Sequence, residues 1–131
     1  MAATVSLQIA QTWNNAHARH YQMVRATSDA VGARCASSLL FLDDTYALEA
    51  LEELLELDRL VTAAIYDIDG KLFAKAGPAD AEVPEQWASQ QPWEQDDGKT
   101  FDVARVINEE GAPVGMVYVR SDLTSMRSQV F

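Results

Sequence analysis

Cysteine, basic residues and long apolar runs are scarce in this 131-residue chain, and each shortage excludes a class of protein or site. Cys35 is the single cysteine, so the sequence cannot form an intrachain disulfide or a cysteine-rich metal site. Acidic residues outnumber basic ones by 20 to 10, and the net charge of −10 argues against nucleic acid or an anionic membrane surface as partner. No run of about 18 apolar residues is present, so the chain is not expected to cross a bilayer by itself.

Proline and glycine are also nearly absent from the first part of the chain. Between residues 4 and 42 there is no proline, and Gly32 is the only glycine. Apolar residues recur there mostly at steps of three, four or seven, which predicts one long amphipathic helix of roughly 55 Å. This length exceeds what a small core needs, so we expect the excess to pack against a second copy of the chain. Cys35 lies on the apolar face and is predicted to be a packed small side chain.

The acidic pair Asp43 and Asp44 interrupts this pattern and is suited to the start of a second helix. Over residues 45–58, leucines including Leu48 gather on one predicted face and glutamates on the other, which indicates a helix with one solvated side. From Leu60 onward, short apolar runs are separated by turns. These runs predict four strands, at residues 60–67, 71–77, 100–108 and 112–120. Two sequential hairpins covered by helices indicate an α+β fold with an antiparallel sheet.

Three of the four prolines fall within residues 77–99, which predicts a long loop. Pro84 suits a first helical position, so one short helix is expected in this loop at residues 84–90. Another short helix is expected at the C-terminus, with Ser121 or Asp122 as its cap. The chain is thus expected to be one domain with a long first helix, a core and a short final helix, at residues 1–42, 43–121 and 122–131.

The apolar run that ends at Asp67 is followed by Ile68, Asp69 and Gly70, and this motif admits three interpretations. Haloacid-dehalogenase-type phosphatases begin similarly, with one aspartate as nucleophile and the next as general acid and base. Lys71 replaces the expected threonine, and the remaining chain is too short for the rest of such a site. A calcium loop would place apolar residues at its first and last ligand positions. The favoured interpretation is a tight turn, with Asp69 and Gly70 supplying side-chain hydrogen bonds and a positive φ.

Other candidate residues each admit two interpretations. His17 and His20 share a helical face, but a third metal ligand is not evident, so a solvated or dimer-facing pair is predicted. Trp87 and Trp93 either line a small-molecule pocket or close one edge of the core. Arg105 either extends to solvent at a sheet edge or binds an anion. Nothing assembles a nucleophile, a base and an oxyanion donor, so no catalytic residue, metal or cofactor is expected.

Three motifs, taken in order, resemble the eighth class of CHASE-type extracytoplasmic sensor domains. They are Leu-Phe-x-Asp-Asp at residues 40–44, Ile-Tyr-Asp-x-Asp-Gly-x-Leu-Phe-Ala at 65–74, and Pro-Val-Gly-x-Val-Tyr-Val-Arg-Ser-Asp-Leu at 113–123. The resemblance covers residues 37–127, and the long first helix is compatible with it. These domains are PAS-like modules of bacterial membrane receptors, among them diguanylate cyclases.

The resemblance implies a PAS-like periplasmic input domain of a receptor in the bacterial inner membrane. One transmembrane helix would precede residue 1 and another would follow Phe131, with the output domain in the cytoplasm. The long helices would pair in a homodimer, and a small molecule or a periplasmic protein would be sensed. The family shares no catalytic residues, so this domain is expected not to be an enzyme.

The loop at 77–99 and the adjoining face of the sheet are the expected recognition surface. The candidate ligand-binding residues are Tyr66, Trp87, Trp93, Arg105 and Tyr118. Two rival functions remain open. The chain could be an interaction module that binds a periplasmic protein through its acidic surface, or a small phosphohydrolase that uses Asp67 and Asp69.

Overall fold

The structure, a computed structural model, describes residues 2–57 and 60–124, and their side chains from residue 17 onward. Within these residues the chain forms two helices and five strands, so the predicted α+β class is confirmed. The helices are α1 (Ala2–Leu40) and α2 (Asp44–Leu54). The strands are β1 (Leu60–Asp67), β2 (Leu72–Ala76), β3 (Trp93–Asp96), β4 (Thr100–Glu109) and β5 (Ala112–Asp122).

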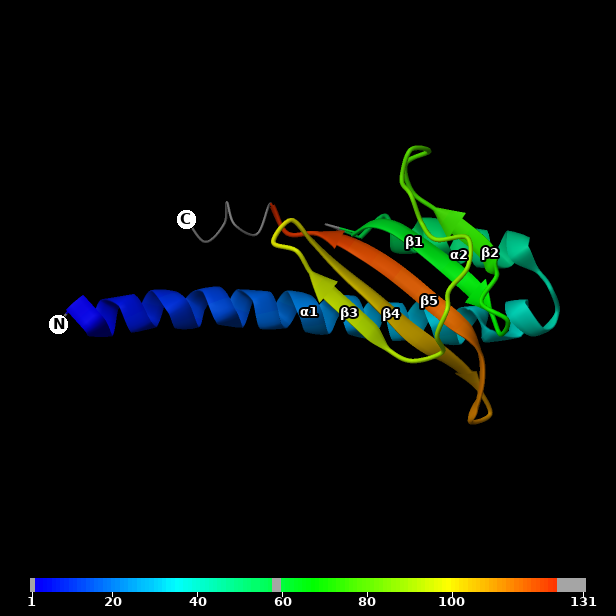
Figure 1. Cartoon of the computed structure of the whole chain (residues 1–131), viewed down its shortest axis with the longest axis horizontal. Coiled ribbons are helices and arrows are strands. Elements are labelled where there is room, and N and C mark those ends of the chain that lie inside the picture. The colour runs from blue at the N-terminus through cyan, green and yellow to red at the C-terminus, as the bar shows by residue number, and fades with distance from the viewer. Residues whose placement is uncertain (1, 58–59, 125–131) are drawn as a thin grey trace.

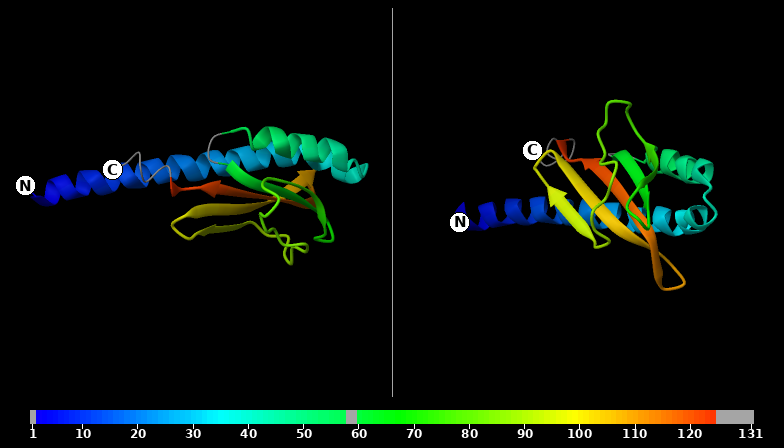
Figure 2. Two further views of the ribbon diagram at one scale, coloured as in Figure 1. Left: turned by 90° about the horizontal axis from the view of Figure 1, so that it is seen from above. Right: turned by 45° about the vertical axis from the view of Figure 1, so that its right-hand side comes forward.

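The strands form one antiparallel sheet in the order β2-β1-β5-β4-β3. The first and last strands, β1 and β5, pair at its centre along most of their length. Both helices lie on one face of the sheet, and the loop between β2 and β3 crosses the opposite face (Figures 1 and 2). Among the described residues, the sheet therefore separates a helical layer from a layer of loop.

A stripe of buried side chains holds α1 against the sheet. Val24, Val31, Cys35 and Leu39 are buried at steps of seven, four and four residues, as one face of a helix requires. The predicted amphipathic helix and the packed Cys35 are confirmed. This stripe faces the chain's own sheet, so it is not a surface for a second copy. The length in excess of the core is the N-terminal part of α1, which projects past the sheet (Figure 1).

His20 belongs to this buried side of α1 and is not solvated. Its Nε2 lies 2.9 Å from Ser121 Oγ on β5, and Ser121 Oγ lies 2.9 Å from the carbonyl oxygen of Phe101, to which it donates. Because the serine hydroxyl has one proton to give, His20 Nε2 is the donor in its own contact. His17 is partly exposed and packs beside Tyr21. The prediction of a solvated or dimer-facing pair is wrong for His20, because the contact of α1 with β5 turns this residue inward.

The second helix begins as predicted, with Asp43 as its N-cap. Asp43 Oδ1 accepts a hydrogen bond from the Tyr46 N–H at 3.1 Å, which satisfies one free donor of the first turn. The helix ends at Leu54, earlier than predicted. Its buried side chains are Ala47, Ala50, Leu51 and Leu54. Leu48 was predicted on the buried face but is 37% exposed, because α2 turns its two alanines toward the core.

The first hairpin turns tightly at Asp67–Lys71, as predicted. Asp67 Oδ1 accepts hydrogen bonds from the backbone N–H groups of Asp69 and Lys71, both at 2.9 Å. Gly70 has a φ of +82°, a conformation that favours glycine. The predicted turn is confirmed, but its side-chain acceptor is Asp67 and not Asp69. The carboxylate proposed as a phosphatase nucleophile is thus used to hold the backbone.

The loop between β2 and β3 differs from its prediction in two respects. No helix forms at residues 84–90, because the backbone there pairs with the first hairpin: Leu72 N donates to the Glu85 carbonyl at 3.1 Å, and Trp87 N donates to the Gly70 carbonyl at 2.7 Å. The short strand β3 lies inside the predicted loop and pairs with β4. The final helix predicted over 122–131 falls mostly outside the described residues, which end at Thr124.

Two glycines offer a matched test of the first turn. Gly70 and Gly111 both have a φ of +82°, but a Cβ on Gly70 would lie 2.2 Å from the Trp87 carbonyl oxygen, whereas one on Gly111 would meet nothing within 4 Å. We expect Gly111→Ala to lower the free energy of unfolding by about 1–2 kcal/mol through φ strain alone. Gly70→Ala should lose at least about 1 kcal/mol more, because a backbone contact must move. Urea denaturation measures both, and equal losses would contradict the contact between the turn and the loop.

Candidate functional site

The two faces of the sheet carry separate clusters of buried side chains, because successive strand residues point to opposite sides. The face toward the helices includes Ile65, Val103 and Val117. The opposite face carries a smaller cluster, composed of Ala64, Tyr66, Ala104, Met116 and Tyr118. Neither of the described helices lies over this second cluster (Figure 2). Loop residues cover it instead, Trp87 among them.

Four of the five predicted ligand-binding residues come together on this second face. The ring of Trp87 lies 5.6 Å from that of Tyr66, 5.7 Å from that of Tyr118 and 5.7 Å from that of Trp93, measured between centroids. Both tyrosines are buried beneath Trp87, whereas Trp93 is 38% exposed. Trp87 thus closes the core, which was one of its two predicted roles. The tyrosines form the layer beneath it.

Both tyrosine hydroxyls are held by hydrogen bonds. Tyr66 donates to the Pro84 carbonyl at 2.6 Å, and burial raises the pKa of Tyr66 to about 12, which keeps it a donor. Tyr118 donates to Asp102 Oδ2 at 2.8 Å, and Arg120 Nε donates to the same oxygen at 3.3 Å. Burial, and then the bond to Asp102, raise the pKa of Tyr118 well above its ordinary value. These bonds anchor the loop and fix the floor of the aromatic cluster.

An open groove lies on the outer side of this cluster. Its volume is about 430 Å³, and its walls come from the end of the loop and the first residue of β3. The lining residues are Pro84, Gln86, Trp87, Ala88, Ser89, Gln91, Pro92 and Trp93. None of them is ionisable. The groove therefore offers aromatic and apolar surface together with neutral hydrogen-bonding groups.

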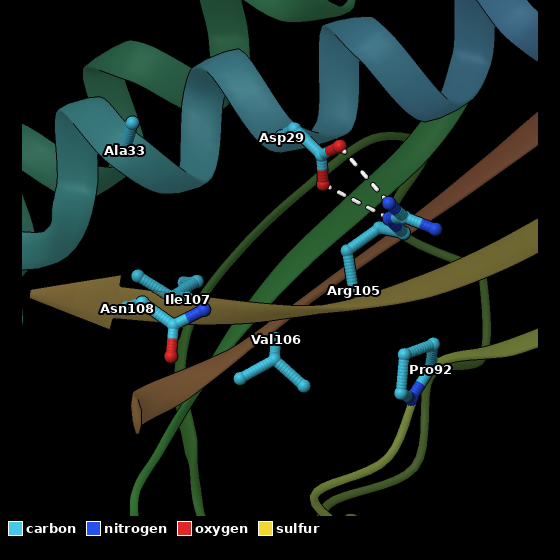
Figure 3. A pocket seen from close by; sticks show the side chains of 7 residues that line it. All are labelled: Asp29, Ala33, Pro92, Arg105, Val106, Ile107 and Asn108. Atoms are coloured by element: carbon cyan, nitrogen blue, oxygen red, sulfur yellow. Dashed lines mark hydrogen bonds and ion pairs between the residues drawn. The ribbon is translucent and has the colours of Figure 1, made fainter. Parts of the chain in front are cut away.

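Arg105 does not join the aromatic residues, because it points to the opposite face of β4. Its Nε and Nη2 donate to the two carboxylate oxygens of Asp29 on α1, at 2.9 and 3.1 Å (Figure 3). A second hollow, of about 400 Å³, lies beside this pair and is bordered by Pro92 and Asn108. The sequence pattern did not suggest Asp29 as a partner, because the two residues lie 76 positions apart.

The strand β3 connects the groove to α1, and sequence analysis missed this connection. Trp93 faces the aromatic cluster, and the next residue, Glu94, pairs with Arg25 on α1, with Arg25 Nη2 donating to Glu94 Oε2 at 2.8 Å. Asp96 accepts a hydrogen bond from the hydroxyl of Tyr21, also on α1. Burial, and then this bond, raise the pKa of Tyr21 to about 12. In Trp-Glu-Gln-Asp the acidic residues Glu94 and Asp96 alternate with the uncharged tryptophan and glutamine, and this period of two is the signal that could have revealed the strand.

The described residues carry no grouped metal ligands. Across 2–57 and 60–124, no three side chains of histidine, cysteine, aspartate or glutamate lie close enough together to hold a metal ion. Neither described helix is both long and apolar enough to cross a membrane.

Two solved structures share this fold, and both are sensor domains of bacterial receptors. The ligand-binding domain of the Campylobacter jejuni chemoreceptor Tlp3, in complex with L-valine, has a TM-score of 0.67 and 11% sequence identity, over 94% of this chain and 60% of that one. The sensor domain of the V. cholerae histidine kinase DctB has a TM-score of 0.60 and 11% identity, over 98% of this chain and 60% of that one. The chain thus spans about 60% of each neighbour, and the likeness shows that it shares their fold.

The sequence then identifies the family. Residues 16–120 match CHASE8, a periplasmic sensor domain, and the chain belongs to this family. No curated protein matches the chain by sequence. Membership confirms the resemblance found in the motifs, and it describes the domain as an extracytoplasmic sensor.

The pair of Glu94 and Arg25 predicts a dependence of stability on pH. The hydrogen bond from Arg25 holds the pKa of Glu94 below its ordinary value of 4.5. Because the folded-state pKa is the lower one, the stabilisation is present above the unfolded-state pKa and is lost as pH falls through the folded-state value. We expect the wild type to exceed Glu94→Gln in free energy of unfolding at neutral pH, and this gap to close as the pH is lowered below the folded-state pKa of Glu94. Urea denaturation across this range is the measurement, with Glu49→Gln on the exposed side of α2 as a charge-matched control. A gap independent of pH would contradict the pairing.

Proposed function

We propose that this chain is the input domain of a homodimeric receptor in the bacterial inner membrane, and that it senses a small molecule in the groove beside Trp93. The observation that carries the proposal is the double role of β3. One face of this strand borders the groove through Trp93, and the other contacts α1 through Glu94 and Asp96. Resemblance to family members that include diguanylate cyclases supports a cyclase as the cytoplasmic output.

The signal would pass from the groove to α1 through a shift of β3. This strand is four residues long and has β4 as its single neighbour in the sheet, so it can move without opening the core. A ligand that binds one position of β3 better than another shifts the population toward that position. Arg25 and Tyr21 would follow Glu94 and Asp96, and α1 would move with them. The projecting end of α1 and the end of β5 lie on the same side of the domain, as connection to one membrane requires (Figure 1).

The dimer would form through the exposed face of α1. Ala26, Ala30 and Ala33 are exposed on the side of the helix opposite the buried stripe. Small side chains allow two helices to approach closely. We therefore propose this face, and not the apolar stripe, as the surface that pairs with a second copy.

A binding role is preferred over catalysis. Asp67 holds the first turn through two backbone N–H groups, which accounts for its position without any reaction. One observation favours a second candidate function, an interaction module for a periplasmic protein. Leu40 at the end of α1 is 56% exposed, and Phe41 and Leu42, which follow it, are 80% and 78% exposed. Such an apolar patch is typical of a protein contact.

Cysteine crosslinking tests the dimer face. In a Cys35→Ala background, we expect Ala26→Cys to form disulfide-linked dimers on mild oxidation, because the two α1 helices would bring this position close to its copy. Glu49→Cys, exposed on α2, serves as the control and should stay monomeric on non-reducing gels. Equal crosslinking at both positions, or none at Ala26, would reject the proposed face.

Native mass spectrometry of the freshly purified chain tests sensing. We expect a mass of two chains plus a discrete small molecule, and loss of the added mass in Trp93→Ala. A dimer without added mass would favour the interaction module instead. A monomer without added mass would contradict dimerisation through α1 alone.

A further inference from the structure

The lining of the groove beside Trp93 restricts the charge of its ligand. None of the eight lining residues is ionisable, although 23% of the chain is charged. A charged ligand would give up water in this groove without gaining a partner of opposite charge, which is unfavourable. Free amino acids, nucleotides and polyamines are therefore disfavoured. The groove suits an uncharged molecule.

The two tryptophans, Trp87 and Trp93, determine the shape of the aromatic surface that a ligand can contact in the groove. Their rings meet edge to face, with centroids 5.7 Å apart and planes at 70°. In this arrangement the ring that presents its edge keeps both of its faces clear of the other ring. Trp93 remains 38% exposed at the mouth of the groove. A ligand with one flat apolar side can therefore stack here, as the C–H face of a sugar ring does.

The polar groups of the lining match hydroxyls, which both donate and accept hydrogen bonds. Gln86 Nε2 donates to the Asp69 carbonyl at 2.7 Å, so its Oε1 remains an acceptor for a ligand. Ser89 Oγ accepts the Gln91 N–H at 3.2 Å, so its own proton remains to be donated. The side-chain amide of Gln91 offers both functions. A volume of 430 Å³ lies within the range of about 300–1,000 Å³ typical of small-molecule pockets.

We infer that the groove binds a neutral sugar, stacked on Trp93 and hydrogen-bonded by the amides of Gln86 and Gln91. This inference rests on the proposed sensing function and names the class of its ligand. The sugar can be a free monosaccharide or the end of a longer glycan, because both present the same ring and hydroxyls.

Matched sugars of different charge test the inference. Glucose and N-acetylglucosamine are neutral, glucosamine carries an ammonium group and glucuronate carries a carboxylate on closely similar rings. In a Trp13→Phe background, where Trp87 and Trp93 are the remaining tryptophans, fluorescence is titrated with each compound and with neutral galactose and mannose. We expect at least one neutral sugar to bind at millimolar concentration or below, and its charged analogue to bind at least tenfold more weakly. Immobilised neutral glycans, assayed in parallel, distinguish a chain end from a free sugar.

Variants then assign the binding to this groove. Trp93→Ala and Gln91→Ala should each weaken binding of the sugar at least tenfold, whereas Gln95→Ala, on β3 but outside the lining, should leave it unchanged. Gln91 is exposed, so its replacement tests the site even if Trp93→Ala fails to fold. Three outcomes would overturn the inference. They are failure of all neutral sugars and glycans to bind, equal binding of the charged analogues, and unchanged binding in Gln91→Ala and any folded Trp93→Ala. A non-sugar molecule that co-purifies with the wild type and is lost in Trp93→Ala would overturn the ligand class alone, whereas absence of any ligand would also remove the proposed small-molecule sensing.

Discussion

Both faces of the sheet are apolar, and the described helices cover only one of them. The structure depends on how the other face is closed, and Trp87 is the residue that closes it, over Tyr66 and Tyr118. A loop can do this only if its backbone polar groups are satisfied. The Tyr66 hydroxyl and the Gly70 carbonyl meet that need by bonding to Pro84 and to the N–H of Trp87. The groove beside Trp93 exists because this cover is a loop and not a helix.

The helical layer is attached in two physically different ways. Over its C-terminal part, α1 is held by buried apolar contacts, which a small shift would disrupt at high cost. Toward β3 and β4 it is held by partly exposed ion pairs, Arg25 with Glu94 and Arg105 with Asp29. Exposed pairs contribute little free energy each and can be rearranged by a weak ligand. The side of α1 that contacts β3 and β4 is therefore the adjustable one.

Local sequence patterns predicted correctly those features whose conformation depends on residues close together in the sequence. The sequence predicted the Asp43 cap, the turn at Gly70 and the alternation within the long strands, because each depends on neighbouring residues. The expected helix after Pro84 does not form, since its backbone donors and acceptors are taken by a hairpin distant in sequence. The partner of Arg105 could not be predicted either, because Asp29 is distant from it in the sequence. Alternation along β1 and β5 places Tyr66 and Tyr118 on one face of the sheet, and the pairing of these two strands brings them together.

The projecting part of α1 has a mechanical consequence. Proline is absent from α1, so the helix can behave as a rigid lever arm. Its pivot is the point at which α1 first packs against the sheet. About 23 residues separate Arg25 from the N-terminal end of the helix, a length of about 35 Å at 1.5 Å per residue. A tilt of about 5° at the pivot would carry the far end through about 3 Å, by the geometry of a straight helix. A displacement at β3 too small to disturb the core would be amplified before it reached the N-terminal end of the helix.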